Sequence, residues 1–105
     1  MTATCTHLDR VEIRHLPEEV AGCEECLREG GRWVHLRICL SCGHVGCCDS
    51  SPGRHASKHA RADAHPIIRS LQPGEDWCWC FVDDLAFVLP QVEGSTKIPP
   101  SPLGG

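Results

Sequence analysis

The chain has 105 residues, with a formal net charge of −4, nine cysteines and seven histidines. This length suits one small domain, and such a domain buries only a modest core, so a metal or another crosslink commonly supports it. The acidic balance disfavours binding to a phosphate backbone, which needs many Lys and Arg side chains, and we expect no nucleic-acid partner.

The cysteines predict metal sites rather than disulfides. Their number is odd, and the accompanying histidines have no use in a disulfide framework. Residues 1–10 lack the basic and apolar regions of a signal peptide, and no run approaches the ~18 apolar residues of a membrane span. We therefore expect a cytoplasmic, monomeric, metal-binding protein without a membrane partner.

Two C-x-x-C knuckles flank the first predicted strand. Cys23 and Cys26 form one knuckle, and Cys39 and Cys42 form the other. Between them, residues 33–38 alternate between two faces, which predicts a half-buried strand. A C-x-x-C turn brings two sulfurs to the same side, as a tetrahedral zinc site requires.

The later elements are short. Their patterns predict a return strand at 45–48, a helix at 54–64, and strands at 67–71 and 77–81, followed by a last apolar run at 85–89. From Pro90 the composition turns to Pro, Gly and Ser, which cannot pack a core. We therefore expect a domain at 1–89 and a flexible tail at 90–105.

Three histidines, His55, His59 and His65, have the spacing of a zinc-protease motif. That motif needs a Glu as general base at the second position and a Gly at the turn, and this chain has Ala56 and Ala62 there. Without the carboxylate, zinc-bound water has no group to take its proton. We therefore expect no enzyme, and a metallohydrolase in particular is disfavoured.

The whole pattern resembles the UBP-type zinc finger, a ubiquitin-binding domain of deubiquitinating enzymes, and in particular its small stand-alone bacterial members. The resemblance covers residues 5 to about 84 and rests on ordered positions: Cys5, His7, Cys23, Cys26, Trp33, Cys39, Cys42, Cys47, His55, His59, His65 and a final Trp-Cys strand. It implies an α+β fold, in which a twisted sheet and one or two short helices surround interleaved zinc sites.

The resemblance also implies how the ligands are grouped. Three Zn²⁺ are expected, or two if the last site is absent. The implied groups are Cys23, Cys26, Cys47 and His55; Cys39, Cys42, His59 and His65; and Cys5, His7 and Cys80 with one more cysteine. Cys78 is the expected fourth ligand of the last group, because C-x-C places both sulfurs on one face of a strand. Cys48 is the alternative to Cys78 or to Cys47.

The resemblance further implies a pocket for the C-terminal Gly-Gly of ubiquitin or another diglycine-tailed protein. The arginine that the pocket uses is replaced by Asp49, which would repel a carboxylate. The candidate peptide-binding residues are Trp33, Arg37, Trp77 and Trp79, and Arg54 and Arg69 are further sources of a cation.

These patterns lead to one main functional hypothesis and one alternative. The main one is a zinc-stabilised module that binds a protein or peptide ligand, including a diglycine tail. The alternative is a zinc- or redox-responsive protein that uses its surplus cysteines, Cys48 or Cys78.

Overall fold

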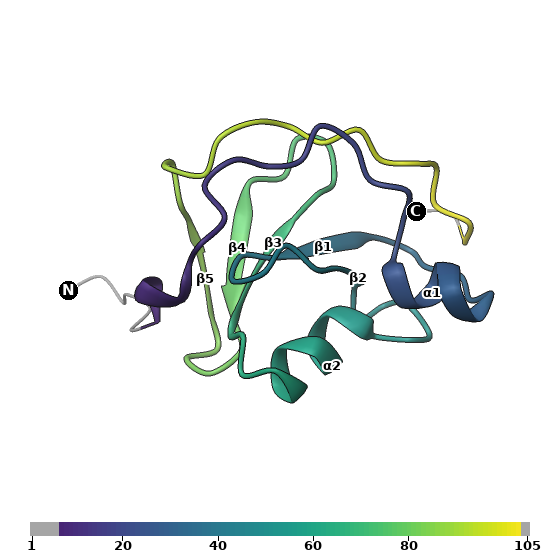
Figure 1. Ribbon diagram of the computed structural model, residues 1–105, viewed down its shortest axis with the longest axis horizontal. Coiled ribbons are helices and arrows are strands. Elements are labelled where there is room, and N and C mark those ends of the chain that lie inside the picture. The colour runs from purple at the N-terminus through teal and green to yellow at the C-terminus, as the bar shows by residue number, and fades with distance from the viewer. Residues whose placement is uncertain (1–6, 104–105) are drawn as a thin grey trace.

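Five antiparallel strands form one sheet in the computed structural model, which describes residues 7–103. The strand order is β2-β1-β3-β4-β5, with bounds β1 Leu36–Cys39, β2 Val45–Cys47, β3 Ile67–Ser70, β4 Trp77–Cys80 and β5 Leu85–Val88. The helices are a short 3-10 turn η1 at Leu8–Arg10, α1 at Glu24–Glu29 and α2 at His55–Ala62. This arrangement confirms the predicted α+β class (Figure 1).

Other parts of the chain cover both faces of the sheet. Both α-helices lie on one side of it, and α2 packs against β1, β2 and β3 (Figure 1). The segment before α1 and the segment after β5 run side by side across the other side (Figure 1). They are joined by two isolated parallel bridges, His15 with Glu93 and Glu19 with Lys97. Because the sheet is covered twice, β1 is buried on both faces, whereas its alternation predicted a half-buried strand.

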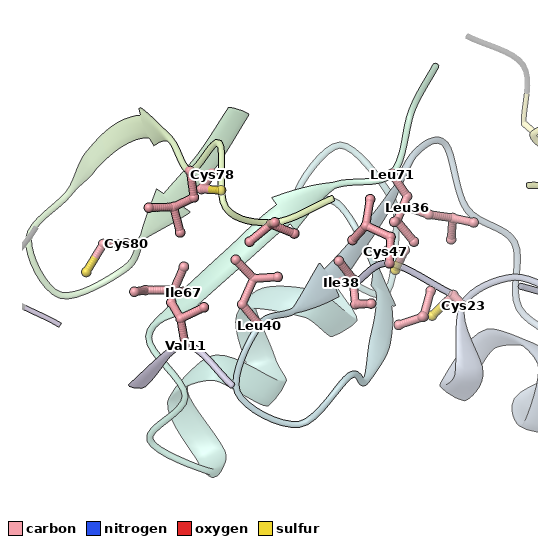
Figure 2. Close-up of a cluster of buried hydrophobic side chains, with 14 of the residues drawn as sticks. Val11, Cys23, Leu36, Ile38, Leu40, Cys47, Ile67, Leu71, Cys78 and Cys80 are labelled. Carbon is pink, nitrogen blue, oxygen red and sulfur yellow. The ribbon is translucent and has the colours of Figure 1, made fainter. Parts of the chain in front are cut away.

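The main core lies under the two crossing segments. It combines apolar residues of the sheet with residues that flank it, and Figure 2 shows its centre, including Val11, Leu36, Ile38, Leu40, Ile67 and Leu71. Val92 also belongs to this core at 6% exposure. Residues 90–103 therefore pack on the domain, where the sequence predicted a tail without core contacts. The backbone bridges hold this segment in place although its composition has no strand or helix pattern.

Helix α2 lies unusually close to the sheet because β2 contains a glycine. A Cβ added at Gly46 would lie 2.7 Å from the backbone nitrogen of Ala56 and 2.9 Å from its Cα. No side chain fits between these two backbones, so Gly46 sets the position of α2. In the described residues, neither α-helix is long and apolar enough to cross a membrane.

Candidate metal centres and binding cavity

Local structure brings the ligands of each knuckle together. Cys23 is the N-cap of α1, where its sulfur accepts a 3.5 Å hydrogen bond from the Cys26 backbone N–H. The second knuckle is a hairpin tip between β1 and β2, and Gly43 takes the positive φ of 84° that this turn needs. Helix α2 carries His55 in its first turn and His59 one turn later, so it reaches both knuckles.

The first candidate metal centre joins α1, β2 and α2. The Nδ1 atom of His55 lies 3.3 Å from the sulfur of Cys23 and 3.4 Å from the sulfurs of Cys26 and Cys47. The sulfurs of Cys26 and Cys47 are 4.0 Å apart. A zinc tetrahedron has S···N edges of about 3.6 Å and S···S edges of about 3.8 Å, so these atoms fit one Zn²⁺. The other ring nitrogen of His55 lies 3.4 Å from Glu29, a carboxylate that orients the ring.

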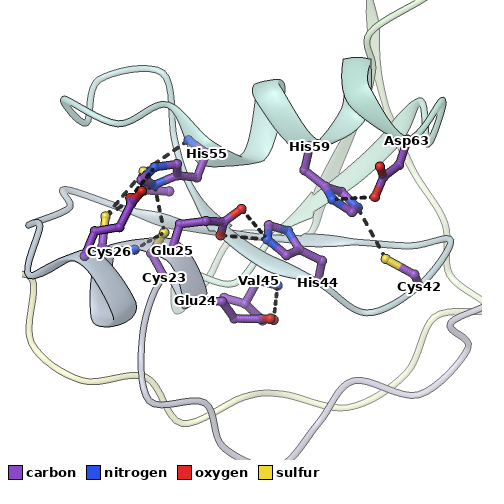
Figure 3. A network of polar contacts seen from close by, with 12 residues as sticks. Cys23, Glu24, Glu25, Cys26, Cys42, His44, Val45, His55, His59 and Asp63 are labelled. Atoms are coloured by element: carbon purple, nitrogen blue, oxygen red, sulfur yellow. Dashed lines mark hydrogen bonds and ion pairs between the residues drawn. The ribbon is translucent and has the colours of Figure 1, made fainter.

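The second candidate centre joins the hairpin tip to α2 and the chain after it. The Nε2 atom of His59 lies 3.3 Å from the sulfur of Cys42 and 3.3 Å from Nδ1 of His65. The sulfur of Cys39 is 3.6 Å from the same His65 nitrogen. The N···N separation equals the roughly 3.3 Å edge of a zinc tetrahedron. Asp63 holds the far nitrogen of His59 at 3.2 Å (Figure 3).

Electrostatics in these groups also favours a bound cation. Burial raises the pKa of Cys23, Cys26 and Cys39. The neighbouring thiols raise the pKa of Cys26 and Cys39 further. Thiolates packed this closely therefore need a positive charge among them. Burial lowers the pKa of His59, which keeps its ring in the neutral form that binds metal.

A third group is smaller and contains a carboxylate. His7, Cys80 and Asp83 each place a ligand atom within 4.8 Å of the others. The sequence pattern predicted Cys5 and Cys78 as further ligands of this group. Cys5 lies outside the described residues. Cys78 is not in the group, because it lies one strand repeat, about 7 Å, before Cys80 and is packed in the core (Figure 2).

The two surplus thiols are both buried. Burial raises the pKa of Cys78 to about 11, so this thiol stays neutral. Cys48 lies outside the first centre, and its sulfur is 3.5 Å from the Ser51 hydroxyl. Burial tends to raise the pKa of Cys48, but hydrogen bonds and the charge of Arg37 outweigh this and lower it. At 0% and 7% exposure, neither thiol resembles the accessible thiol of a redox sensor.

A cavity of about 430 Å³ lies on the helix side of the sheet, beside the first metal centre. One wall consists of Cys48, Asp49 and Ser50. These residues belong to the loop that runs from the ligand Cys47 to the ligand His55. The opposite wall is aromatic, and the lining also includes an arginine and a second acid: Trp77, Trp79, Phe81, Arg37 and Asp84. Because one wall is held at both ends by ligands of one site, metal binding there would fix the shape of the cavity.

Arg37 contributes a buried positive charge to this cavity. Its exposure is 9%, and its guanidinium lies 4.5 Å from the ring centre of Trp77. Its Nη1 donates to the carbonyl of Leu36 and to the hydroxyl of Ser70, both at 3.1 Å, and lies 3.8 Å from Glu75. Burial lowers the pKa of Arg37, although nearby acidic groups oppose this shift.

Only some of the other residues that the sequence proposed for peptide binding lie at this cavity. Trp77 and Trp79 line the cavity, but Trp33 does not. Trp33 is 6% exposed and belongs to the core, and its carbonyl accepts a 3.0 Å hydrogen bond from Ser101. The structure thus places Trp33 in the core rather than at the cavity, with its ring so close to Gly22 that an added Cβ would lie 2.3 Å from it. Arg54 and Arg69 do not line this cavity, so Arg37 is its only arginine among the described residues.

Comparison with known proteins agrees with this arrangement. Residues 23–91 match the family model described as the zinc finger in ubiquitin hydrolases and other proteins. The chain belongs to the UBP-type zinc-finger family. That family is a zinc-finger family rather than a catalytic one, and its ligand chemistry agrees with the two four-ligand groups.

Relatives of this UBP-type zinc finger include domains of much larger enzymes. Ubiquitin carboxyl-terminal hydrolase 16 of Danio rerio is 26% identical over 105 residues, covering 80% of this chain and 13% of the relative. The Mus musculus protein of the same name is 40% identical over 45 residues, which is 40% of this chain and 6% of the relative. The chain therefore spans only a small part of the curated relatives that it matches.

A solved structure shares both the fold and the size of this zinc finger. It is a solution NMR structure of a protein from Rhodopseudomonas palustris, with 48% identity and a TM-score of 0.71. The similarity covers 90% of this chain and 95% of that one. The fold is thus also found in a protein of about the same length.

Sequence reasoning missed two kinds of functional residue. Asp83 was not among the predicted ligands, although Cys80-Phe81-Val82-Asp83 has the spacing of a C-x-x-C knuckle with a carboxylate in the second position. That spacing could have identified it. Phe81 in the cavity could also have been found, because it continues the alternation of Trp77 and Trp79 along β4.

Proposed function

We propose that this zinc finger is a protein-interaction module that takes the C-terminal Gly-Gly of a partner protein into the cavity beside the first metal centre. The observation that carries the proposal is Arg37, a buried guanidinium at an aromatic-lined cavity. A carboxylate is the group that an arginine binds best, through two parallel hydrogen bonds. In the described part of the chain, both hydrogen bonds of Arg37 come from Nη1, so Nη2 and Nε can serve a ligand.

The cavity suits the narrow end of a chain. Its volume of about 430 Å³ is within the range of small-ligand sites and can hold a few residues. Two glycines need no space for side chains, so their backbone can pass between the Trp77 and Trp79 side and the opposite wall. The relatives are named as ubiquitin carboxyl-terminal hydrolases, which supports a ubiquitin-like tail as the ligand class.

The two acidic side chains that line the cavity restrict which peptide tails can bind there. Asp49 is exposed, and its Oδ1 accepts a 2.7 Å hydrogen bond from Ser57 on α2. Asp84 is exposed as well. These carboxylates oppose a ligand that carries only negative charge. They favour a tail with Lys or Arg shortly before the diglycine. The basic side chain of such a tail would form ion pairs with Asp49 and Asp84, while its terminal carboxylate reaches Arg37.

Peptide titration of the zinc-loaded protein tests this function. Two peptides of one sequence, with a basic residue before Gly-Gly, would differ only in ending as a free acid or as an amide. We expect the free acid to bind and the amide to bind at least tenfold more weakly, since a charged hydrogen bond contributes about 1.5–3 kcal/mol. NMR shifts of the Trp77 and Trp79 indole N–H groups would locate the ligand.

Two matched variants test the role of the guanidinium. Arg37→Gln is expected to abolish the preference for the free acid, whereas Arg54→Gln, outside the cavity, leaves it unchanged. Far-UV circular dichroism and the zinc count check that both variants fold. If neither peptide binds the wild-type protein, capture of a diglycine tail is wrong.

A further inference from the structure

The third ligand group differs in chemistry from the other two. His7 comes from the N-terminal segment, Cys80 ends β4, and Asp83 lies in the turn before β5. The Nδ1 atom of His7 is 3.1 Å from Oδ2 of Asp83 and 3.6 Å from the sulfur of Cys80. One ring nitrogen thus faces both acceptors. A proton on that nitrogen can point at only one of them, whereas a metal ion placed between the three atoms contacts them all.

The separations fit a tetrahedral metal site. Zinc bound to nitrogen, oxygen and sulfur has N···O edges of about 3.4 Å and N···S edges of about 3.6 Å. The backbone N–H of Asp83 donates a hydrogen bond to the sulfur of Cys80 at 3.4 Å. This hydrogen bond folds residues 80–83 into a turn, which brings the carboxylate back to the sulfur.

We propose that Asp83 is a direct zinc ligand and that it makes the third centre an exchangeable zinc site, unlike the two structural centres. Among the described ligands, the third centre supplies a carboxylate besides one thiolate and one imidazole, whereas the first centre supplies three thiolates and one imidazole and the second supplies two of each. Zn²⁺ prefers thiolate to carboxylate, so the mixed set holds it less tightly. The inference concerns Asp83 and does not depend on Cys5, which lies outside the described residues.

Exposure of the ligands supports exchange. The side chains of His7 and Asp83 are 26% and 23% exposed, so water and chelators reach the ion from their side. In the first centre the three cysteines are 0–2% exposed, whereas the second centre combines the buried Cys39 with the exposed Cys42, so exposure separates the third centre from the first only. The third centre also joins the N-terminal segment to the turn before β5, two segments that contribute little to either structural centre. Zinc can therefore leave it while the knuckles and α2 stay in place.

Chelator competition followed by native mass spectrometry tests the inference. The wild-type protein is expected to hold three zinc ions at saturation and to lose one of them first. Asp83→Asn keeps the side-chain shape, and we expect it to weaken the third ion at least tenfold while two ions stay bound. Asp83→Cys supplies a thiolate at the same place, and it is expected to bind the third ion more tightly than the wild type. Asp84→Asn, one residue away and outside the group, is the matched control.

Cadmium substitution gives a readout that a merely structural role of Asp83 would not change. The ¹¹³Cd chemical shift reports the number of bound sulfurs, so Asp83→Cys should move one of three signals toward the range of sulfur-rich sites. Three results would overturn the proposal: saturation of the wild type at two zinc ions, equal retention of the third ion by Asp83→Asn and Asp84→Asn, or an unchanged cadmium signal in Asp83→Cys.

Discussion

Alanine at Cys47 and alanine at Cys48 are expected to have very different effects, although the two residues are neighbours and both are buried. The sulfur of Cys47 lies 3.4 Å from Nδ1 of His55 in the first centre, and that of Cys48 lies outside this centre near Ser51. Cys48→Ala removes one buried atom, which costs about 1 kcal/mol as in other single-atom core deletions. For a domain of this size that lowers the melting temperature by about 4–8 °C.

Cys47→Ala removes a zinc ligand. Changes in groups that only support a ligand already weaken metal binding about 10–100-fold, or ~1.4–2.8 kcal/mol, so loss of the ligand itself should exceed about 3 kcal/mol. Metal affinity is folding free energy in a structural site, and a domain has only about 5–15 kcal/mol of net stability. The melting temperature should therefore fall by more than about 12 °C, with one zinc ion lost.

Thermal unfolding followed by circular dichroism, together with native mass spectrometry of the same samples, measures both effects. Excess chelator is the control, since removal of zinc should erase most of the difference between the two variants. Loss of a zinc ion in Cys48→Ala, with the full count kept in Cys47→Ala, would show that the first centre has been assigned to the wrong cysteine.

Three further predictions concern other parts of the domain. Gly46→Ala forces α2 away from β2 and should destabilise the domain by about 1–3 kcal/mol in urea titration, whereas Gly31→Ala, whose new Cβ meets nothing closer than 3.4 Å, should cost less than about 0.5 kcal/mol. Ala56→Glu supplies the missing carboxylate of the protease motif, but a fluorogenic peptide assay should detect no zinc-dependent cleavage, because His55 and His59 belong to different ligand groups. Cys78→Ala should keep the wild-type zinc count in native mass spectrometry, and a lost ion there would restore Cys78 as a ligand.

Much of the fold could be predicted from local patterns. The strands predicted at 67–71 and 77–81 and the helix at 54–64 match β3, β4 and α2 to within one or two residues, because alternation and helix composition act locally. The apolar run at 85–89 contains β5, which the sequence did not identify as a strand. The packing of the C-terminal segment could not be predicted. It depends on bridges between residues about 78 positions apart, such as His15 with Glu93, and such pairings leave no periodic signal in either segment.

The candidate sites, too, could be predicted from the sequence only in part. Knuckle spacing and family resemblance proposed the two groups that contain Cys23 and Cys39, because C-x-x-C determines local geometry whatever surrounds it. Only the structure distinguished Arg37 from Arg54 and Arg69, since membership of a cavity depends on which strands are neighbours. Trp33 shows the converse, because a tryptophan in a plausible position is buried in the core, where its ring packs against Gly22.

The sequence by itself determined that this protein is a small acidic domain of the UBP zinc-finger type, with cysteine and histidine pairs at metal-binding spacing, because ligand type and short spacing are properties of the chain. The tertiary structure decided which sulfurs meet which histidines. It placed Cys47 rather than Cys48 in the first centre, and it brought Asp83 rather than Cys78 to His7 and Cys80. These choices depend on the direction of side chains on packed strands and turns, where a shift of one residue moves a sulfur to the opposite face.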